Sequence, residues 1–88
     1  MSKYIEVEYY ADWAFATRAI RIGNILEENF SQLSISYKSS EDLYNKIEVS
    51  WIKDGVKEVV WSGGRQEATK DREKIVELMK NSMWALEW

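Results

Sequence analysis

The sequence predicts a single two-layer α/β domain over residues 1–88, with a four-stranded mixed sheet and both helices on one sheet face. Its 88 residues, 45% apolar and 31% charged, suit one modest core with a soluble surface. Strand-like alternation changes twice to helical spacing, and the expected element order is β-α-β-β-β-α. Because the strands alternate polar and apolar residues, we expect the second sheet face to be largely open to water.

The first strand and helix are predicted for residues 3–10 and 13–30. Apolar and acidic residues alternate along the strand, and Asp12 is placed to cap the helix with its carboxylate. Small and apolar residues at helical spacing are expected to form the buried stripe: Ala16, Ala19, Ile20, Gly23 and Leu26. Glycine costs a helix about 1 kcal/mol relative to alanine, so we expect Gly23 to permit close approach to the sheet.

A second strand is predicted for residues 33–37, where apolar and polar residues alternate again. Strand, helix and strand within about 35 residues are typical of a right-handed parallel βαβ unit. Residues 39–45 are polar and are expected to form a loop.

The second half of the chain predicts a β-hairpin followed by a closing helix. Strands are expected at 46–53 and 56–62, joined at Asp54-Gly55, because glycine adopts positive φ at little cost. Gly63-Gly64 is expected to end the second of these strands, and Thr69 to cap the helix. The predicted apolar stripe of that helix comprises Ile75, Leu78, Met79, Ser82 and Leu86.

The chain contains neither cysteine nor histidine. The lack of cysteine excludes disulfides, zinc–thiolate sites and thiol–disulfide exchange, since the exchange requires a thiolate. The usual proton shuttle and the commonest transition-metal ligand are also absent. The paired acidic residues lack the spacing of a calcium loop. We therefore expect no metal and no cofactor.

The net charge of −3 argues against nucleic-acid binding, which normally needs a basic excess. Two small basic clusters, Arg18 with Arg21 and Lys70 with Arg72 and Lys74, are interpreted as solvated helix faces. Gly63-Gly64 lacks the spacing of a phosphate-binding loop. No apolar run approaches the ~20 residues of a membrane span, so we expect a cytoplasmic protein with no membrane partner.

Aromatic residues at two places are candidate protein-binding residues, because Trp and Tyr are enriched at binding hot spots. Tyr10, Trp13 and Phe15 flank Asp12 where the first strand passes into the first helix, although Trp13 or Phe15 can instead fold inward and fill the core. Trp84 and Trp88 stand in an unusually apolar tail, where they either pack on the sheet or meet a partner.

Trp51 and Trp61, on neighbouring predicted strands, are expected to be cross-strand packing partners rather than ligand platforms.

Several segments, taken in their order along the chain, resemble the selenoprotein W family and its bacterial Cys-x-x-Cys relatives, the Rdx family. The resemblance covers residues 3–80, and rests on pattern and spacing at Val7-Glu-Tyr9, Ile25-Leu-Glu-Glu-Asn-Phe30, Ile47-Glu-Val49, Asp54-Gly55, Val60-Trp-Ser62 and Ile75-Val-Glu-Leu-Met79. It implies a thioredoxin-like two-layer sandwich.

The redox residues of that family fall on Tyr10 and Trp13, so the functional motif is replaced by Tyr-Ala-Asp-Trp. The family also tends to carry a proline before its third strand, whereas this chain has none and places Ser39 or Ser40 in that region. The resemblance thus implies a scaffold that has lost two parts of its redox machinery.

The sequence predicts a redox-inactive protein-interaction or regulatory domain, not an enzyme, whose partner is another protein or a second copy in a homodimer. The alternative is a small-ligand-binding protein or non-redox enzyme using the former active-site cleft. No nucleophile is paired with a base at recognisable spacing, which disfavours that alternative.

Overall fold

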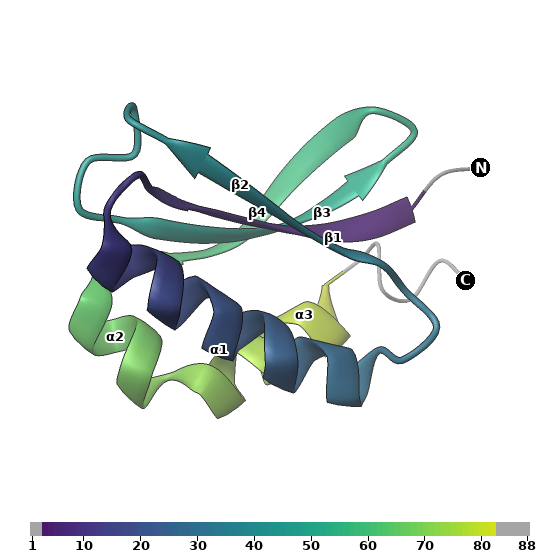
Figure 1. Cartoon of the computed structure of the whole chain (residues 1–88). Helices are drawn as coiled ribbons and strands as arrows, with labels where there is room; N and C mark the ends of the chain where they lie inside the picture. Colours follow the sequence, from purple (N-terminus) through teal and green to yellow (C-terminus); the bar gives the residue numbers. More distant parts are fainter. Residues whose placement is uncertain (1–2, 83–88) are drawn as a thin grey trace.

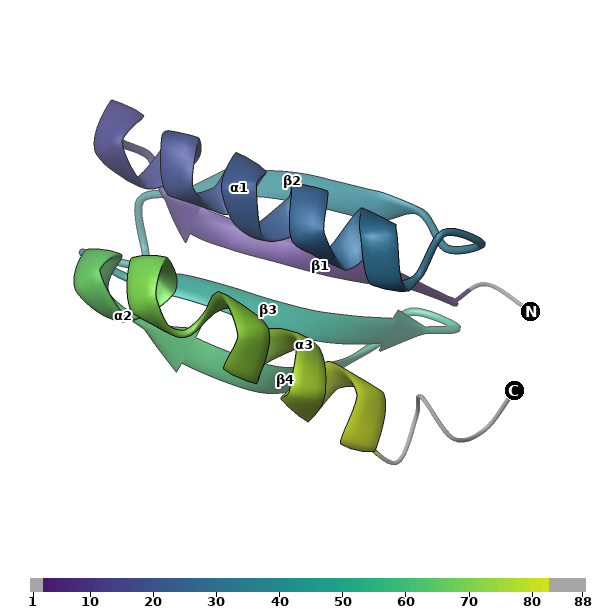
Figure 2. The same ribbon diagram turned by 90° about the horizontal axis from the view of Figure 1, so that it is seen from below.

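The computed structural model describes residues 3–82, in which four strands and three helices form two layers (Figure 1). Both ribbon views show the helices on the same side of the sheet (Figures 1 and 2). In chain order the elements are β1 (Lys3–Tyr10), α1 (Trp13–Asn29), β2 (Ile35–Ser40), β3 (Ile47–Lys53), β4 (Val56–Gly63), α2 (Arg65–Lys70) and α3 (Arg72–Asn81).

The sheet has the strand order β2-β1-β3-β4. β1 runs parallel to β2 and antiparallel to β3, and β3 is antiparallel to β4. The prediction of a small α+β fold with a four-stranded mixed sheet is therefore confirmed. β1 lies second from one edge, so it is paired on both sides along its length.

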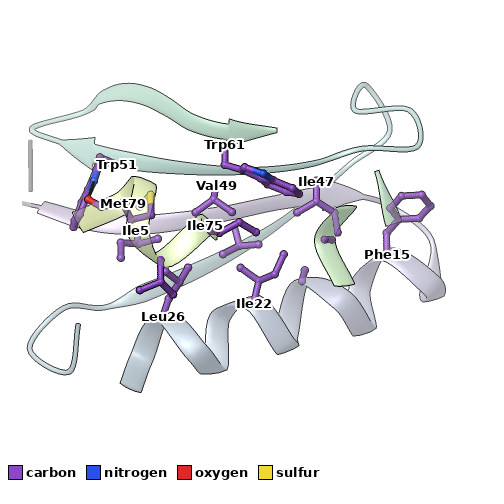
Figure 3. Packing of buried hydrophobic residues seen from close by; sticks show 14 residues of the cluster. Ile5, Phe15, Ile22, Leu26, Ile47, Val49, Trp51, Trp61, Ile75 and Met79 are labelled. Atoms are coloured by element: carbon purple, nitrogen blue, oxygen red, sulfur yellow. Dashed lines mark hydrogen bonds between the residues drawn. The ribbon is translucent and has the colours of Figure 1, made fainter. Parts of the chain in front are cut away.

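The core lies between the sheet and the helices, because alternate residues of the strands point to that side. Ile5 of β1 stands opposite Ile35 and Trp51, and all three contribute to the core layer. Figure 3 shows the apolar side chains filling this layer from Trp51 at one end to Phe15 at the other. The buried cluster comprises Ile5, Val7, Phe15, Ala19, Ile22, Leu26, Ile47, Val49, Trp51, Trp61, Ala68, Ile75, Val76 and Met79.

Both tryptophans of the hairpin are buried, but they are not direct cross-strand partners. Trp61 stands opposite Val49, whereas Trp51 stands opposite Glu58 and contacts Phe30 edge-on at 5.5 Å. The Trp51 indole also donates a hydrogen bond to the Met79 carbonyl at 3.3 Å, which satisfies its buried N–H. The packing prediction is correct, while the pairing prediction is wrong, because the two-residue turn at Asp54-Gly55 places Trp51 opposite Glu58 and the register shift after Val49 places Trp61 opposite Val49.

The helical stripe of α1 is rotated from the predicted one. Ile20 is 53% exposed, whereas Phe15 and Ile22 are buried together with Ala19 and Leu26. Apolar residues occur nearly all round this helix, so periodicity alone leaves its rotation open.

Gly23 confirms the predicted close approach of α1 to the sheet. A Cβ at this position would lie 1.8 Å from Tyr37 Oη and 2.5 Å from its ring carbon Cζ. The Tyr37 ring of β2 therefore lies directly over the helix backbone. The pKa of the Tyr37 hydroxyl is raised, first by burial and then by the charge of Glu27.

The predicted single closing helix is two helices, which is a correction to the expected element order. Gly64 is the N-cap of α2, and Thr69 lies inside that helix instead of capping one. Asp71 stands at the break and is the N-cap of α3. Gly63-Gly64 therefore ends β4 and leads directly into α2. Ile75 and Met79 are buried as predicted, and Leu86 lies outside the described residues.

β2 begins and ends later than predicted. Leu33 belongs to a turn in which its N–H donates to the Phe30 carbonyl. Ser39 and Ser40, expected in a loop, extend the strand because they pair with Tyr9 and Tyr10 of β1. Backbone pairing with a buried neighbour thus outweighs the polar sequence of this edge strand.

The hairpin turn is as predicted: Asp54 and Gly55 both have positive φ, 51° and 82°. Two positive φ values in succession match the turn type that follows the natural twist of paired strands.

An ion-pair cluster covers part of the sheet face opposite the helices. The Lys57 ammonium lies 3.1 Å from a carboxylate oxygen of Glu6 and donates a hydrogen bond to Glu8. Burial alone would raise the pKa of Glu8, but the hydrogen bond from Lys57 and the charges of Lys57 and Lys38 bring it below its ordinary value. Burial likewise opposes the charge of Lys57, but Glu8 and Glu6 raise its pKa. The cluster therefore holds its charges over a wide pH range.

We expect Lys57→Met to lower the free energy of unfolding at neutral pH by about 1–3 kcal/mol, since it removes the ion-pair partner of two largely buried carboxylates. Glu8 has a lowered pKa in the folded state, so its contribution is present above about pH 4.5 and is lost as pH falls through the folded value. Lys57 has a raised pKa, so its contribution is lost only as pH rises above about 10.5.

Urea unfolding of wild type and Lys57→Met between pH 3 and 8 measures this effect (about five pH steps suffice). The difference between the two proteins should shrink below about pH 4.5. Lys74→Met, at an exposed position of α3, is the matched control. A pH-independent difference would contradict the assigned role of the cluster.

Gly23→Ala tests the contact with Tyr37. In the wild-type background the new methyl group must displace the ring, and we expect a loss of about 1–2 kcal/mol. In a Tyr37→Ala background the same change should instead stabilise by up to about 1 kcal/mol, through the helix propensity of alanine. Denaturant unfolding of the four proteins gives both values, and equal signs in the two backgrounds would refute the contact.

Candidate functional site: an aromatic corner beside a seam of arginines

The candidate site is built on the tight turn that joins β1 to α1. The Asp12 N–H donates to the Tyr10 carbonyl at 2.7 Å, and the Ala11 N–H donates to the Ser40 carbonyl at 3.2 Å. Asp12 then caps the helix, because its Oδ1 accepts from the Ala14 N–H at 2.9 Å. The prediction that Asp12 is an N-cap is confirmed.

This turn places successive aromatic residues on different sides of the backbone. Phe15 points into the core and is 5% exposed, whereas Trp13, the first residue of α1, is 83% exposed. Figure 3 shows Phe15 at the end of the core beside the start of α1. The structure therefore corrects Phe15 from a candidate contact residue to a packing residue, while Trp13 is free to meet a partner.

Tyr10 connects the core to a second exposed aromatic residue. Its ring contacts the rings of Phe15 and Tyr44 edge-on, with distances between ring centres of 5.6 Å and 5.3 Å. Tyr44 is 68% exposed and comes from the segment between β2 and β3. We call Tyr10, Trp13, Phe15 and Tyr44 the aromatic corner. Sequence reasoning missed Tyr44, since nothing in its polar surroundings links it to Tyr10.

The segment directly before β3 passes beside this corner. The Lys46 carbonyl accepts a hydrogen bond from the Tyr10 N–H at 3.0 Å, and Asn45 has a positive φ of 56°. The residues preceding β3 are thus Asn45 and Lys46, whereas Ser39 and Ser40 belong to β2.

Trp84 and Trp88, the other two predicted contact residues, lie outside the described residues.

A hollow of about 510 Å³ adjoins the aromatic corner, lined by Asp12, Phe15, Asn45, Arg65, Gln66 and Glu67. The Arg65 guanidinium lies 5.7 Å from the centre of the Phe15 ring, a cation–π distance. Arg65 therefore borders both the hollow and the aromatic corner.

Two charged side chains that could act as acid, base or nucleophile are engaged in structural contacts. The Asp12 carboxylate is already engaged as a helix cap. Elsewhere, Lys57 is held charged between two carboxylates, which makes its amine a poor nucleophile. Within residues 3–82 no three acidic side chains converge as metal ligands.

The structure brings together basic residues that the sequence shows as two separate clusters. One narrow hollow between the helices, without room for a water molecule, is lined by Arg18, Arg21, Arg72 and two α2 residues. A second, of about 490 Å³, is lined by Arg18, Arg65 and Lys70 with Gln66 and Thr69. We call Arg18, Arg21, Arg65, Lys70 and Arg72 the arginine seam. It contains all four arginines of the chain.

The periodicity of the sequence does not predict the arginine seam, because the seam depends on how α2 docks beside α1. Lys74, grouped with these residues in the sequence, does not line either hollow. Arg65 was not among the predicted basic clusters.

No helix in the described part of the chain is both long and apolar enough to cross a membrane.

The comparisons with known proteins add no relative: the chain matches no protein-family model, no curated protein and no solved structure.

Proposed function

We propose that this chain is a redox-inactive, thioredoxin-like protein-interaction or regulatory domain of the cytoplasm, with the aromatic corner, apart from the buried Phe15, as its contact surface. The observation that carries the proposal is the 83% exposure of Trp13 at a turn held by hydrogen bonds on both sides. A tryptophan in water forgoes a large hydrophobic gain, and such residues dominate binding energy when a partner covers them.

The strand order supports the thioredoxin-like part of the proposal. A parallel β1-α1-β2 unit is followed by an antiparallel hairpin, and β1 lies between β2 and β3. On this interpretation Tyr10 and Trp13 stand where the Rdx family carries its reactive sulfurs. The old reaction site then becomes a surface that binds without chemistry.

The partner in this proposal is another protein or a second copy of the chain. Trp13 and Tyr44 are exposed and amphipathic, which suits a protein surface with an apolar centre and polar rim. Ile20, also exposed, lies two helical turns from Trp13 on α1 and extends the apolar contact area.

A second candidate, a small-ligand-binding protein or non-redox enzyme, is favoured by the hollow beside Phe15 and Arg65. Its volume falls within the usual range for ligand sites. Its lining is mostly polar and charged, however, and the Asp12 carboxylate there is committed to the helix cap. A binding surface therefore fits the geometry better.

We expect Trp13→Ala to weaken partner binding by at least about 30-fold, the effect of losing a hot spot of 2 kcal/mol. The free energy of unfolding should change by less than about 0.5 kcal/mol, because the side chain makes few buried contacts. Tagged wild type and variant are used to capture proteins from the source cells, with quantitative mass spectrometry. Sedimentation equilibrium of both proteins measures self-association.

Val56→Ala is the matched control, because Val56 is 58% exposed at the hairpin, where β4 begins and far along the sheet from Tyr10. Partners or dimers that survive Val56→Ala and are lost with Trp13→Ala support the proposal. If neither a captured protein nor a dimer depends on Trp13, the aromatic corner is not the contact surface.

A further inference from the structure

The arginine seam is a concentration of positive charge on an acidic protein. The chain has a net charge of −3, yet its four arginines and Lys70 line two hollows that share Arg18 and Thr69. Both hollows are lined by residues of α1 and α2, and these two helices run beside each other (Figure 2). Like charges repel one another, so gathering these cations costs free energy that another interaction must offset.

The arginines of the seam have no salt-bridge partner among the described residues, because none of the four lies within salt-bridge distance of a carboxylate in residues 3–82. Arg18 donates from Nη1 to the Ala14 carbonyl at 2.9 Å, while its Nε is buried without an acceptor. A buried donor that lacks an acceptor is costly. The Arg18 guanidinium would therefore be better satisfied with a bound anion than in the protein alone.

Two of the arginines stand at the first position of a helix, where a positive charge is unfavourable. Arg65 is the first residue of α2 and Arg72 the first residue of α3. Cations are disfavoured at helix N-termini, where the unpaired N–H groups present positive charge. Glu67 and Glu73 in the same first turns offset this only in part. Side chains that break a local rule point to a function outside folding.

We infer that the arginine seam binds an acidic segment of a partner protein, rich in Asp or Glu carboxylates. Guanidinium groups match carboxylates in shape and form paired hydrogen bonds with them. Five cationic groups line the hollow of about 490 Å³ and the narrow one beside it, an arrangement that suits several carboxylates in succession better than one small anion. Arg65 also borders the aromatic corner, so the seam continues the proposed contact surface.

A nucleic acid fits the molecule less well. The net charge is negative, and Glu6 and Glu8 lie together on the sheet face opposite the helices. Asp12 and Glu67 line the hollow next to the seam. A polyanion long enough to pass beyond the seam would therefore meet repulsion.

The test uses a short fluorescent oligoglutamate peptide at low ionic strength, measured by fluorescence anisotropy. We expect binding that weakens as salt is added. Arg65→Gln with Arg72→Gln should reduce affinity about tenfold, from two solvent-accessible charge contacts of up to 1 kcal/mol each. This double variant should unfold at the same temperature as wild type or higher, because it removes cations from two helix starts.

Lys74→Gln with Lys80→Gln is the matched control, since it removes the same charge from exposed positions of α3 outside the seam. Its affinity should stay within about twofold of wild type. Side-chain Nε–Hε signals of the arginines should shift on titration, with those of Arg18 among them.

The inference rests on the proposed function for its partner class, but its test is separable. The probe has no aromatic residue, so Trp13→Ala should leave its binding unchanged, and loss of partner capture in that variant would not alter the result. Equal weakening by the two double variants would overturn the inference, because net charge alone would explain it. Absence of binding at low salt, or equal arginine-dependent binding of single-stranded DNA, would also overturn it.

Discussion

The turn around Asp12 is the constraint on which the rest of the molecule depends. β1 must leave its place between β2 and β3 and become α1 within two residues, Ala11 and Asp12. Hydrogen bonds to Ser40 and Tyr10 and the Asp12 cap fix this passage. Once the turn is set, the rotation of α1 follows, with Phe15 inward and Trp13 outward. The core and the exposed corner therefore have the same origin.

That turn also explains why the fold was easier to predict than the details of packing. Alternation in β1, the Asp12 cap and the Asp54-Gly55 turn are local signals, and each was read correctly from the sequence. The rotation of α1 was not, because Ile20 and Ile22 are equally apolar and only the geometry of the turn distinguishes them. The later limits of β2 depend on pairing with β1, which is not a local property.

The residues of the candidate site also fall into those that local sequence signals indicate and those that only tertiary packing brings together. Tyr10 and Trp13 were found because a strand passes into a helix at their positions, where α/β proteins commonly bind. Tyr44 and the arginine seam come from segments distant in sequence, brought together by the docking of the β2–β3 segment and of α2. The break at Asp71 was also missed, since the polar sequence around it suits either a helix or its end.

The bulge in the hairpin has a consequence for the sheet edge. The register shift gives β4 an extra residue, Val60, between Trp61 and Val59. It allows Trp61 to reach the core, and it leaves the outer edge of β4 irregular and next to Lys57 and Glu58. An irregular, charged border is a poor template for an incoming strand. The same irregularity that completes the interior thus guards this flank against amyloid-like growth.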